Sequence, residues 1–177
     1  MARAASIPTA RAASMLTRLA AIAAAAAAPI SPTVEVAPGV DMPVLSLGTC
    51  CGSDPSVGVV PWLTHGGSGI DTAWDYFDQP AVGKGIVDSG VDRSDVFVLT
   101  KVPPVFDAMK KVKADLRQLG LDQADLILLH NPTTKASNAK LYAQLEEALA
   151  QGLTRARGRV AREVAATPRL PTPPRNI

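Results

Sequence analysis

Five polar side chains that can donate or accept protons or hydrogen bonds follow short apolar segments of this sequence. They are Thr49, Asp71, Tyr76, Lys101 and His130. A tyrosine hydroxyl is a weak acid near neutral pH, because its ordinary pKa is about 10. An ammonium group about 4 Å away favours the phenolate form by up to about 4 kcal/mol at an effective dielectric constant of 20. A tyrosine, a lysine and a carboxylate brought together therefore suit the delivery of a proton to a carbonyl group.

The residue types predict a division of roles in such a site. We expect Tyr76 to donate the proton and Lys101 to favour the phenolate that remains. Asp71 would keep Lys101 charged and oriented. A neutral His130 would donate a hydrogen bond to the carbonyl oxygen and align it. No side chain donates hydride, so the reductant has to come from a bound cofactor.

Each of these residues also has an ordinary structural explanation. Asp71 could cap a turn, and His130 could be a core histidine with satisfied hydrogen bonds. Tyr76 could be a half-buried aromatic residue, and Lys101 a cation whose stem lies along apolar surface. For any one of them the structural explanation is favoured. The occurrence of all four at equivalent strand ends favours a functional site instead.

Four predicted strands and four predicted helices would carry these residues. The strands are short apolar runs between turn residues, at residues 45–49, 70–73, 96–101 and 125–130. The helices are expected at residues 57–64, 81–89, 107–119 and 141–150. In the third helix, apolar residues recur at helical spacing: Met109, Val112, Leu116 and Leu119. Before the first strand, a Pro38–Gly39 turn predicts a hairpin of residues 34–37 and 42–44.

Strands that alternate with helices predict an α/β fold with a parallel sheet. Burial on both faces explains why "VFVLT" and "DLILLH" are almost continuously apolar. An open doubly wound sheet and a (β/α)8 barrel both fit this pattern. The open nucleotide-binding sheet predicts G-x-G-x-x-G after the first strand, but "TCCGSD" follows Gly48, and no G-x-x-x-x-G-K-[ST] occurs. In a barrel, the C-terminal ends of the strands share the face on which active sites are built.

The order of four segments resembles the first half of the aldo-keto reductases, over about residues 34–158. These segments are "MPVLSLGT", "GIDTAWDYF", "RSDVFVLTK" and "DLRQLGLDQADLILLHNP". The resemblance implies a (β/α)8 TIM-barrel type of fold that reduces aldehydes and ketones with NADPH. It also implies that Tyr76 is the proton donor, that Lys101 and Asp71 activate it, and that His130 orients the carbonyl. Gly48 and Thr49 match residues beside the nicotinamide, and Asp71 also lies close to the cofactor in such enzymes.

The resemblance implies an incomplete barrel of about four β/α units after the hairpin, because a whole barrel takes about 250 residues. In the family, the next strand carries a Ser-Asn pair that holds the nicotinamide carboxamide, but here "RVAREVAATPRLPTPPRNI" follows Gly158. The second half of such enzymes binds the cofactor phosphates, so weak cofactor binding is expected here. Uncovered sheet edges would favour self-association.

Three regions are expected along the chain. Residues 1–33 contain Arg3, Arg11 and Arg18 among alanines, with no acid before Glu35, and predict a plastid or mitochondrial transit peptide. One alternative is a secretory signal. The other is a leader that carries no targeting signal, in a cytoplasmic protein. Residues 34–158 form the partial barrel. Residues 159–177 form a basic, proline-rich disordered tail.

Composition limits the other function classes. The chain has 177 residues, 47% hydrophobic and 19% charged, which allows one sizeable core. The net charge of +2 arises at the two ends, so we predict no nucleic-acid partner, and the apolar run at residues 19–28 is too short to span a membrane. The adjacent Cys50 and Cys51 cannot make a metal site unaided, and packed or idle thiols are favoured over a strained disulfide.

Two classes of function remain open. The first is an NADP(H)-dependent reductase of a small carbonyl substrate. The second is a non-catalytic regulatory or binding homologue, or a truncated gene product, that keeps the partial barrel for association. The retained Asp, Tyr, Lys and His favour the first, and the missing cofactor-binding half favours the second.

Overall fold

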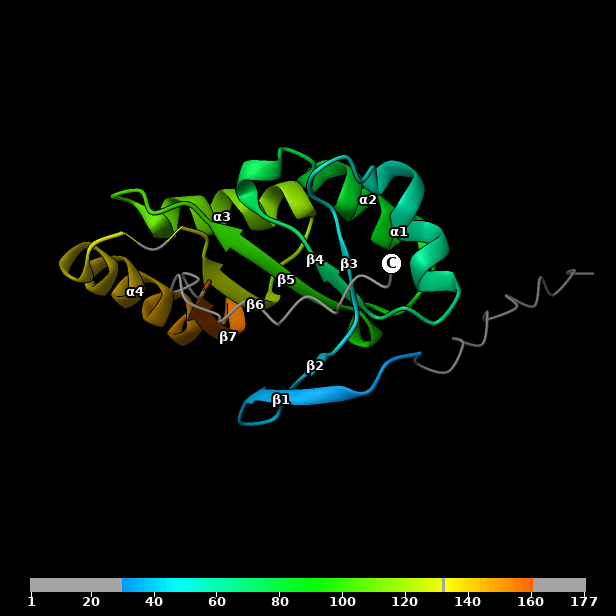
Figure 1. The fold of residues 1–177 in the computed structure, drawn as a ribbon, viewed down its shortest axis with the longest axis horizontal. Helices are drawn as coiled ribbons and strands as arrows, with labels where there is room; N and C mark the ends of the chain where they lie inside the picture. Colours follow the sequence, from blue (N-terminus) through cyan, green and yellow to red (C-terminus); the bar gives the residue numbers. More distant parts are fainter. Residues whose placement is uncertain (1–29, 132, 161–177) are drawn as a thin grey trace, which may run out of the picture.

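The computed structural model describes residues 30–131 and 133–160. The predicted leader up to residue 29 and the predicted tail from residue 161 lie outside the described residues. Figure 1 shows a sheet with helices along one side and a separate hairpin beside it. In the described part of the chain, no helix is both long enough and apolar enough to cross a lipid bilayer.

The central sheet has five parallel strands whose spatial order is their order along the chain. The strands are β3 (Ser46–Gly48), β4 (Gly69–Asp71), β5 (Phe97–Val102), β6 (Ala124–Leu129) and β7 (Thr154–Arg159). The connections contain α1 (Pro55–Thr64), α2 (Gln79–Ser89), α3 (Ala108–Leu119) and α4 (Lys135–Ala150). Two 3-10 turns, η1 (Trp74–Tyr76) and η2 (Arg93–Asp95), lie after β4 and before β5. This succession of β/α units is a partial (β/α)8 barrel and confirms the predicted fold class.

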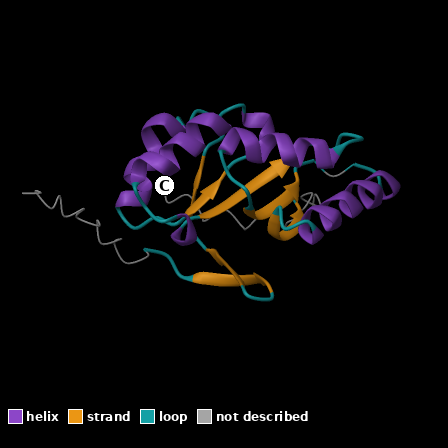
Figure 2. Cartoon of the chain, turned by 180° about the vertical axis from the view of Figure 1, so that it is seen from behind, coloured by secondary structure: helices purple, strands orange, loops and turns teal. Residues whose placement is uncertain are grey.

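The two faces of the sheet are covered differently. Apolar side chains of the helices pack against one face, in clusters that include Val59, Val98, Val112 and Ile127. The other face carries a smaller cluster that includes Phe97. Figure 2 shows the helices on one side of the sheet and the hairpin on the opposite side. Because both faces are packed, β5 and β6 are nearly continuous apolar runs.

The predicted hairpin is confirmed as β1 (Thr33–Ala37) and β2 (Val40–Pro43), which pair antiparallel. Gly39 takes a φ of 69° in the turn, a backbone conformation that favours glycine. Val40 is buried with Phe97 of β5 in the smaller apolar cluster. Arg155 of β7 donates to the Gly39 carbonyl over 3.1 Å. The hairpin is therefore attached to the face of the sheet that the helices leave open.

Helix ends follow from their capping residues. Asp107 accepts a hydrogen bond from the backbone NH of Lys110 at the start of α3, and Gly120 ends the helix with a φ of 67°. The helix α1 forms although Pro61 lies inside it. Its buried Val59 and Leu63 pack under the sheet, and tertiary packing of this kind outweighs the missing hydrogen bond.

The fifth strand, β7, is the main correction to the expected architecture. The sequence pattern predicted only four strands in the sheet, and that count was wrong. Thr154 and Ala156 of β7 are buried, whereas its three arginines, at positions 155, 157 and 159, are exposed or half-buried. Because polar residues occupy alternate positions, this strand contains no continuous apolar run that would predict it. Its backbone hydrogen bonds come from pairing with β6.

Candidate active site

The predicted site residues lie at one end of the parallel sheet. Thr49 follows β3, Asp71 ends β4, and Lys101 is the second-last residue of β5. His130 follows β6, and its backbone NH donates to the Val102 carbonyl over 2.9 Å. Parallel pairing in register places these strand ends together, which puts their side chains within reach of one another.

The ammonium of Lys101 is the centre of the cluster. Its side chain is buried, and Nζ donates three hydrogen bonds. The acceptors are the Asp71 carboxylate, the Thr72 carbonyl at 3.0 Å and the Tyr76 hydroxyl at 3.3 Å. A lysine ammonium has three donors and no acceptor, so all of its hydrogen-bonding capacity is used. The phenol oxygen of Tyr76 accepts from Lys101 and keeps its own proton available.

Tyr76 is held by the turn η1 that follows β4. Its backbone NH donates to the Ala73 carbonyl over 3.0 Å, and Phe77 then takes a left-handed φ of 58°. At the start of the turn, Lys111 of α3 places Nζ 4.4 Å from the centre of the Trp74 ring, a cation–π contact. These contacts fix the turn from both ends and direct Tyr76 toward Lys101.

His130 completes the group of four. Its ring lies edge-on to the ring of Tyr76, with 5.5 Å between the ring centres. Its Nδ1 lies 3.2 Å from the Oδ2 atom of Asp75, the residue that precedes Tyr76. The structure therefore brings Asp71, Tyr76, Lys101 and His130 together, and it adds Asp75, which the sequence analysis missed. A carboxylate next to the predicted acid, on the same loop, was the available signal.

A second polar group lies behind the strand ends, on the helix side of the sheet. Its members are fully buried, and we call them the buried polar cluster: Thr72, Gln79, Thr100 and Asp115. Thr72 donates to Gln79 over 2.6 Å, and Thr100 donates to Asp115 over 2.6 Å. Gln79 in turn donates to Asp115. Burial raises the pKa of Asp115 to about 6, although its hydrogen bonds to Gln79 and Thr100 oppose that rise.

Asp115 was also missed by the sequence analysis. It lies on α3 three residues after Val112 and next to Leu116, both of which are buried. A carboxylate at this position breaks the apolar face of an amphipathic helix. That break was the signal in the sequence, since a buried acid is rare unless it has partners.

The predicted cofactor-binding residues line the first two strand ends. The backbone NH of Thr49 donates to the Asp71 carbonyl over 3.1 Å. The hydroxyl of Thr49 is buried and has no hydrogen-bond partner among the residues that the structure describes. A Cβ atom built on Gly48 would meet nothing within 4 Å. An unsatisfied buried hydroxyl beside open space fits a ligand with a polar group, such as the carboxamide of a nicotinamide.

Two further observations concern the cysteines and possible metal sites. The structure joins Cys50 and Cys51 in a disulfide, so the expectation of packed or idle thiols was wrong. Cys51 takes a left-handed φ of 65°. Within residues 30–131 and 133–160, no group of three or more His, Cys, Asp or Glu side chains could hold a metal ion.

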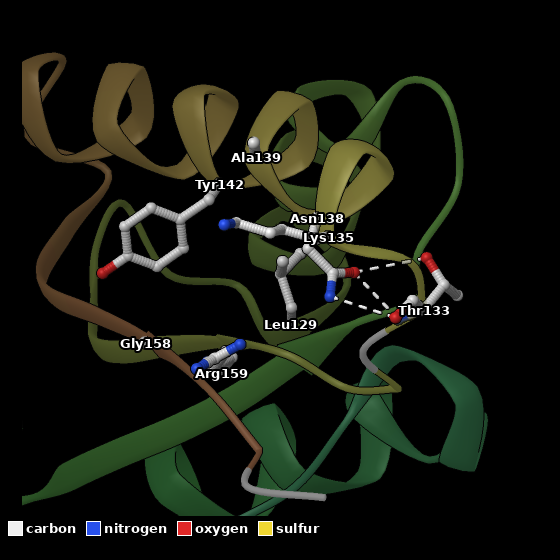
Figure 3. A pocket seen from close by; sticks show the side chains of 8 residues that line it. All are labelled: Leu129, Thr133, Lys135, Asn138, Ala139, Tyr142, Gly158 and Arg159. Carbon is white, nitrogen blue, oxygen red and sulfur yellow. Dashed lines mark hydrogen bonds between the residues drawn. The ribbon is translucent and has the colours of Figure 1, made fainter.

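A separate pocket lies between α4 and the ends of β6 and β7, and contains none of the four clustered residues (Figure 3). It has a volume of about 530 Å³, and its walls include Lys135, Tyr142 and Arg159. On its rim, the backbone NH of Thr133 donates to Asn138 over 2.8 Å. Its described lining residues include two cations, Lys135 and Arg159, and no Asp, Glu or His. We therefore place the candidate active site at the Lys101 cluster.

Comparison with known proteins identifies the family of this chain. Residues 59–165 match the family model "Aldo/keto reductase family". Morphine 6-dehydrogenase of Pseudomonas putida is 37% identical over 139 residues, which are 72% of this chain and 46% of that protein. An aldo/keto reductase from Brucella melitensis superposes with a TM-score of 0.70 at 28% identity, covering 76% of this chain and 56% of that one.

A third relative is an aldo-keto reductase of Bombyx mori whose structure was solved in complex with NADP. It superposes with a TM-score of 0.63 at 28% identity, over 73% of this chain and 50% of that one. This chain thus spans about half the length of the relatives that it matches. The family model covers more than half of the chain, and the chain belongs to the aldo/keto reductase family.

Proposed function

We propose that this chain carries the acid–base half of an NADPH-dependent reductase, which converts aldehydes or ketones to alcohols with Tyr76 as the proton donor. The observation that carries the proposal is the set of three hydrogen bonds made by the buried Lys101 ammonium. One of these bonds reaches the Tyr76 hydroxyl, and another reaches the Asp71 carboxylate. This arrangement suits the delivery of a proton to a carbonyl oxygen.

The proton transfer follows from this geometry. Tyr76 accepts from Lys101, so its phenolic hydrogen can point to a carbonyl oxygen held in front of it. When that hydrogen leaves, a negative charge develops beside the ammonium. A unit charge about 4 Å away stabilises it by up to about 4 kcal/mol at an effective dielectric constant of 20. Asp71 and the Thr72 carbonyl keep Nζ in place while the charge forms.

His130 would bind and orient the carbonyl oxygen. Its ring stands edge-on beside Tyr76, so a substrate oxygen in front of the phenol would also be near the imidazole. Nδ1 faces Asp75, which leaves Nε2 as the ring atom available to a substrate. A substrate oxygen held by two groups has less freedom to rotate, which favours a reactive geometry.

The reductant that fits the described residues is a nicotinamide cofactor. The unsatisfied Thr49 hydroxyl, the open space beside Gly48 and the carboxylate of Asp71 lie at neighbouring strand ends. When bound, NADPH would supply the hydride that no side chain can supply. The complex of the Bombyx mori relative with NADP supports this choice of cofactor.

The proposal is tested with the purified chain. NADPH binding is measured by fluorescence titration, and turnover by the oxidation of NADPH with a generic aldehyde. Replacing Tyr76 with Phe removes only the hydroxyl, so we expect the rate to fall about 100- to 10,000-fold while the Kd for NADPH changes little. A rate equal to that of the wild type would show that Tyr76 is not the acid.

A non-catalytic homologue is the second candidate. In that case NADPH binding and aldehyde turnover would both be missing from a folded chain. Turnover in the wild type that is lost in Tyr76→Phe would exclude this candidate.

A further inference from the structure

Asp75 is a charged residue of the candidate site to which the proposed chemistry assigns no step. It lies in the middle of the turn η1, between Trp74 and Tyr76. Its side chain is 35% exposed, and the His130 side chain beside it is 18% exposed. One short turn therefore presents both the proposed acid, Tyr76, and the carboxylate that contacts the proposed orienting residue.

The contact between Asp75 and His130 determines where a ring proton lies. Oδ2 of Asp75 is 3.2 Å from Nδ1 of His130. An ionised carboxylate can only accept hydrogen bonds, so the bond requires a hydrogen on Nδ1. The hydrogen-bond partner of one ring nitrogen decides the state of the other. In a neutral ring, Nε2 would then carry a lone pair and no hydrogen.

We propose that Asp75 is a positioning residue that fixes the tautomer and the plane of the His130 ring. This inference rests on the proposed function, because the ring is useful only if it meets a substrate oxygen. With Nδ1–H held by Asp75, a neutral His130 accepts from the hydroxyl of an alcohol through Nε2. It donates from Nε2 to a carbonyl only when both ring nitrogens are protonated. The neutral donor expected from the sequence needs its hydrogen on Nε2, so the contact with Asp75 and that expectation imply different tautomers, which ring 15N shifts distinguish.

The other charged residues at these strand ends come from three strands. Lys101 of β5 lies behind Tyr76, with Nζ paired to Asp71 of β4. Arg159 of β7 is paired in register with Leu129, the residue before His130. Asp75 is the partner that makes a hydrogen bond to the ring. It is thus the group that can select one ring nitrogen over the other.

The first test needs no cofactor or substrate. Ring 15N chemical shifts distinguish a protonated from an unprotonated nitrogen, and the chain has only two histidines. His65 is an internal reference, because its Nδ1 lies 2.7 Å from the Pro61 carbonyl and must also carry a hydrogen. A His65→Gln variant assigns the two sets of signals. In the wild type at a pH where the ring is neutral, we expect His130 to be protonated at Nδ1.

Three variants make the test specific. Asp75→Asn keeps an oxygen that can accept from Nδ1, so we expect the same tautomer. Asp75→Leu removes the acceptor, and we expect a large part of His130 to move to the Nε2–H form while the His65 signals stay unchanged. Asp75→Ala is the second variant if the leucine disturbs folding, which is checked by thermal unfolding. A neutral His130 with its hydrogen on Nε2 in the wild type, or the same tautomer in all variants, would overturn the inference.

The second test is kinetic and has a matched control. Asp88→Asn removes another partly exposed carboxylate, one that pairs with Lys84 on α2, and should leave the rate unchanged. Because Asp75 also fixes the plane of the His130 ring, Asp75→Leu should lower kcat for an aldehyde by about 10- to 100-fold even though it frees the Nε2–H form, with a smaller loss in Asp75→Asn and little change in the Kd for NADPH. A wild-type kcat in Asp75→Leu would overturn the positioning role. If the wild type has no turnover, the proposed function fails, and the 15N measurement still decides the role of Asp75 toward the ring.

Discussion

Two polar clusters share the same strand ends but face opposite sides of the sheet. Lys101 donates to Asp71 and Tyr76 in the candidate active site. The strand neighbours Thr72 and Thr100 donate instead to Gln79 and Asp115 under the helices. Successive side chains of a strand point to opposite faces, so two adjacent residues serve different clusters. The first cluster is partly exposed, and Asp71 keeps 41% of its side-chain surface, while the second is fully buried.

Because the two clusters differ in burial, substitutions in one should affect mainly the reaction and substitutions in the other mainly the stability of the fold. The active-site cluster can lose a partner and be hydrated by solvent, so changes there should affect mainly the reaction. Solvent cannot hydrate the buried polar cluster when a partner is lost, and each unpaired polar group away from water then costs about 1–3 kcal/mol of stability. The Thr72 carbonyl joins the clusters by accepting from Lys101, so the buried cluster also supports the position of the ammonium.

The largest effect is expected from Lys101→Met. The variant keeps an apolar stem but removes the charge that, in the proposed reaction, would stabilise the phenolate. We expect aldehyde turnover to fall about 100- to 10,000-fold and the free energy of unfolding to change by about 1 kcal/mol or less, since Asp71 can be hydrated. Steady-state kinetics and urea unfolding measure the two quantities. A large loss of stability together with the rate would show that the two clusters are not separable.

The next effect is a pH dependence of stability from Asp115. The pKa of Asp115 is about 6 in the folded chain, above the ordinary value of 3.8 that we take for the unfolded chain. Between these two pH values the folded chain keeps a proton that the unfolded chain has lost. The free energy of unfolding contributed by this group therefore falls as pH rises through this window, by about 3 kcal/mol in total. Asp115→Asn cannot titrate and should lack this loss.

The measurement compares urea unfolding of the wild type and Asp115→Asn at several pH values from 4 to 7.5. The difference between the two should grow in favour of the variant as pH rises. Asp88→Asn is the control, because Asp88 is an exposed carboxylate in an ion pair on the helix surface. A constant difference between wild type and Asp115→Asn across this range would contradict the assigned burial effect.

The smallest effect is expected from Thr49→Val. The substitution removes a buried hydroxyl that has no partner among the described residues, so the stability of the free chain should stay constant or rise slightly. If the hydroxyl binds the cofactor, the Kd for NADPH should rise about 10-fold. Fluorescence titration and thermal unfolding give both values. An unchanged Kd would remove Thr49 from the cofactor site.

Much of the fold could be predicted because the apolar pattern is local. The four predicted strands and four predicted helices all occur, with boundaries that differ by a few residues, and the hairpin occurs as well. The exception is β7, whose alternating arginines do not form an apolar run. Its strand conformation depends on pairing with β6, a partner about thirty residues earlier in the sequence, and no local pattern reports that pairing.

The candidate site was predicted less completely than the fold. Residue types at strand ends were enough to indicate Asp71, Tyr76, Lys101 and His130, because parallel strands bring their C-terminal ends together. Asp75 and Asp115 were missed, since their importance depends on contacts with His130 and Gln79, which are far from them in the chain. The disulfide between Cys50 and Cys51 was missed because the backbone turn at Cys51 is not evident from residue types.

The sequence alone determined the α/β class, the positions of the main helices and strands, and the family to which the chain is similar. These properties depend on hydrophobic periodicity and on short ordered motifs, which are visible in the order of residues along the chain. Only the tertiary structure decided which carboxylate pairs with Lys101, which one holds His130, and which one is buried with a raised pKa. Those pairings depend on distances and burial, and both arise when the chain brings remote residues together in a medium that excludes water.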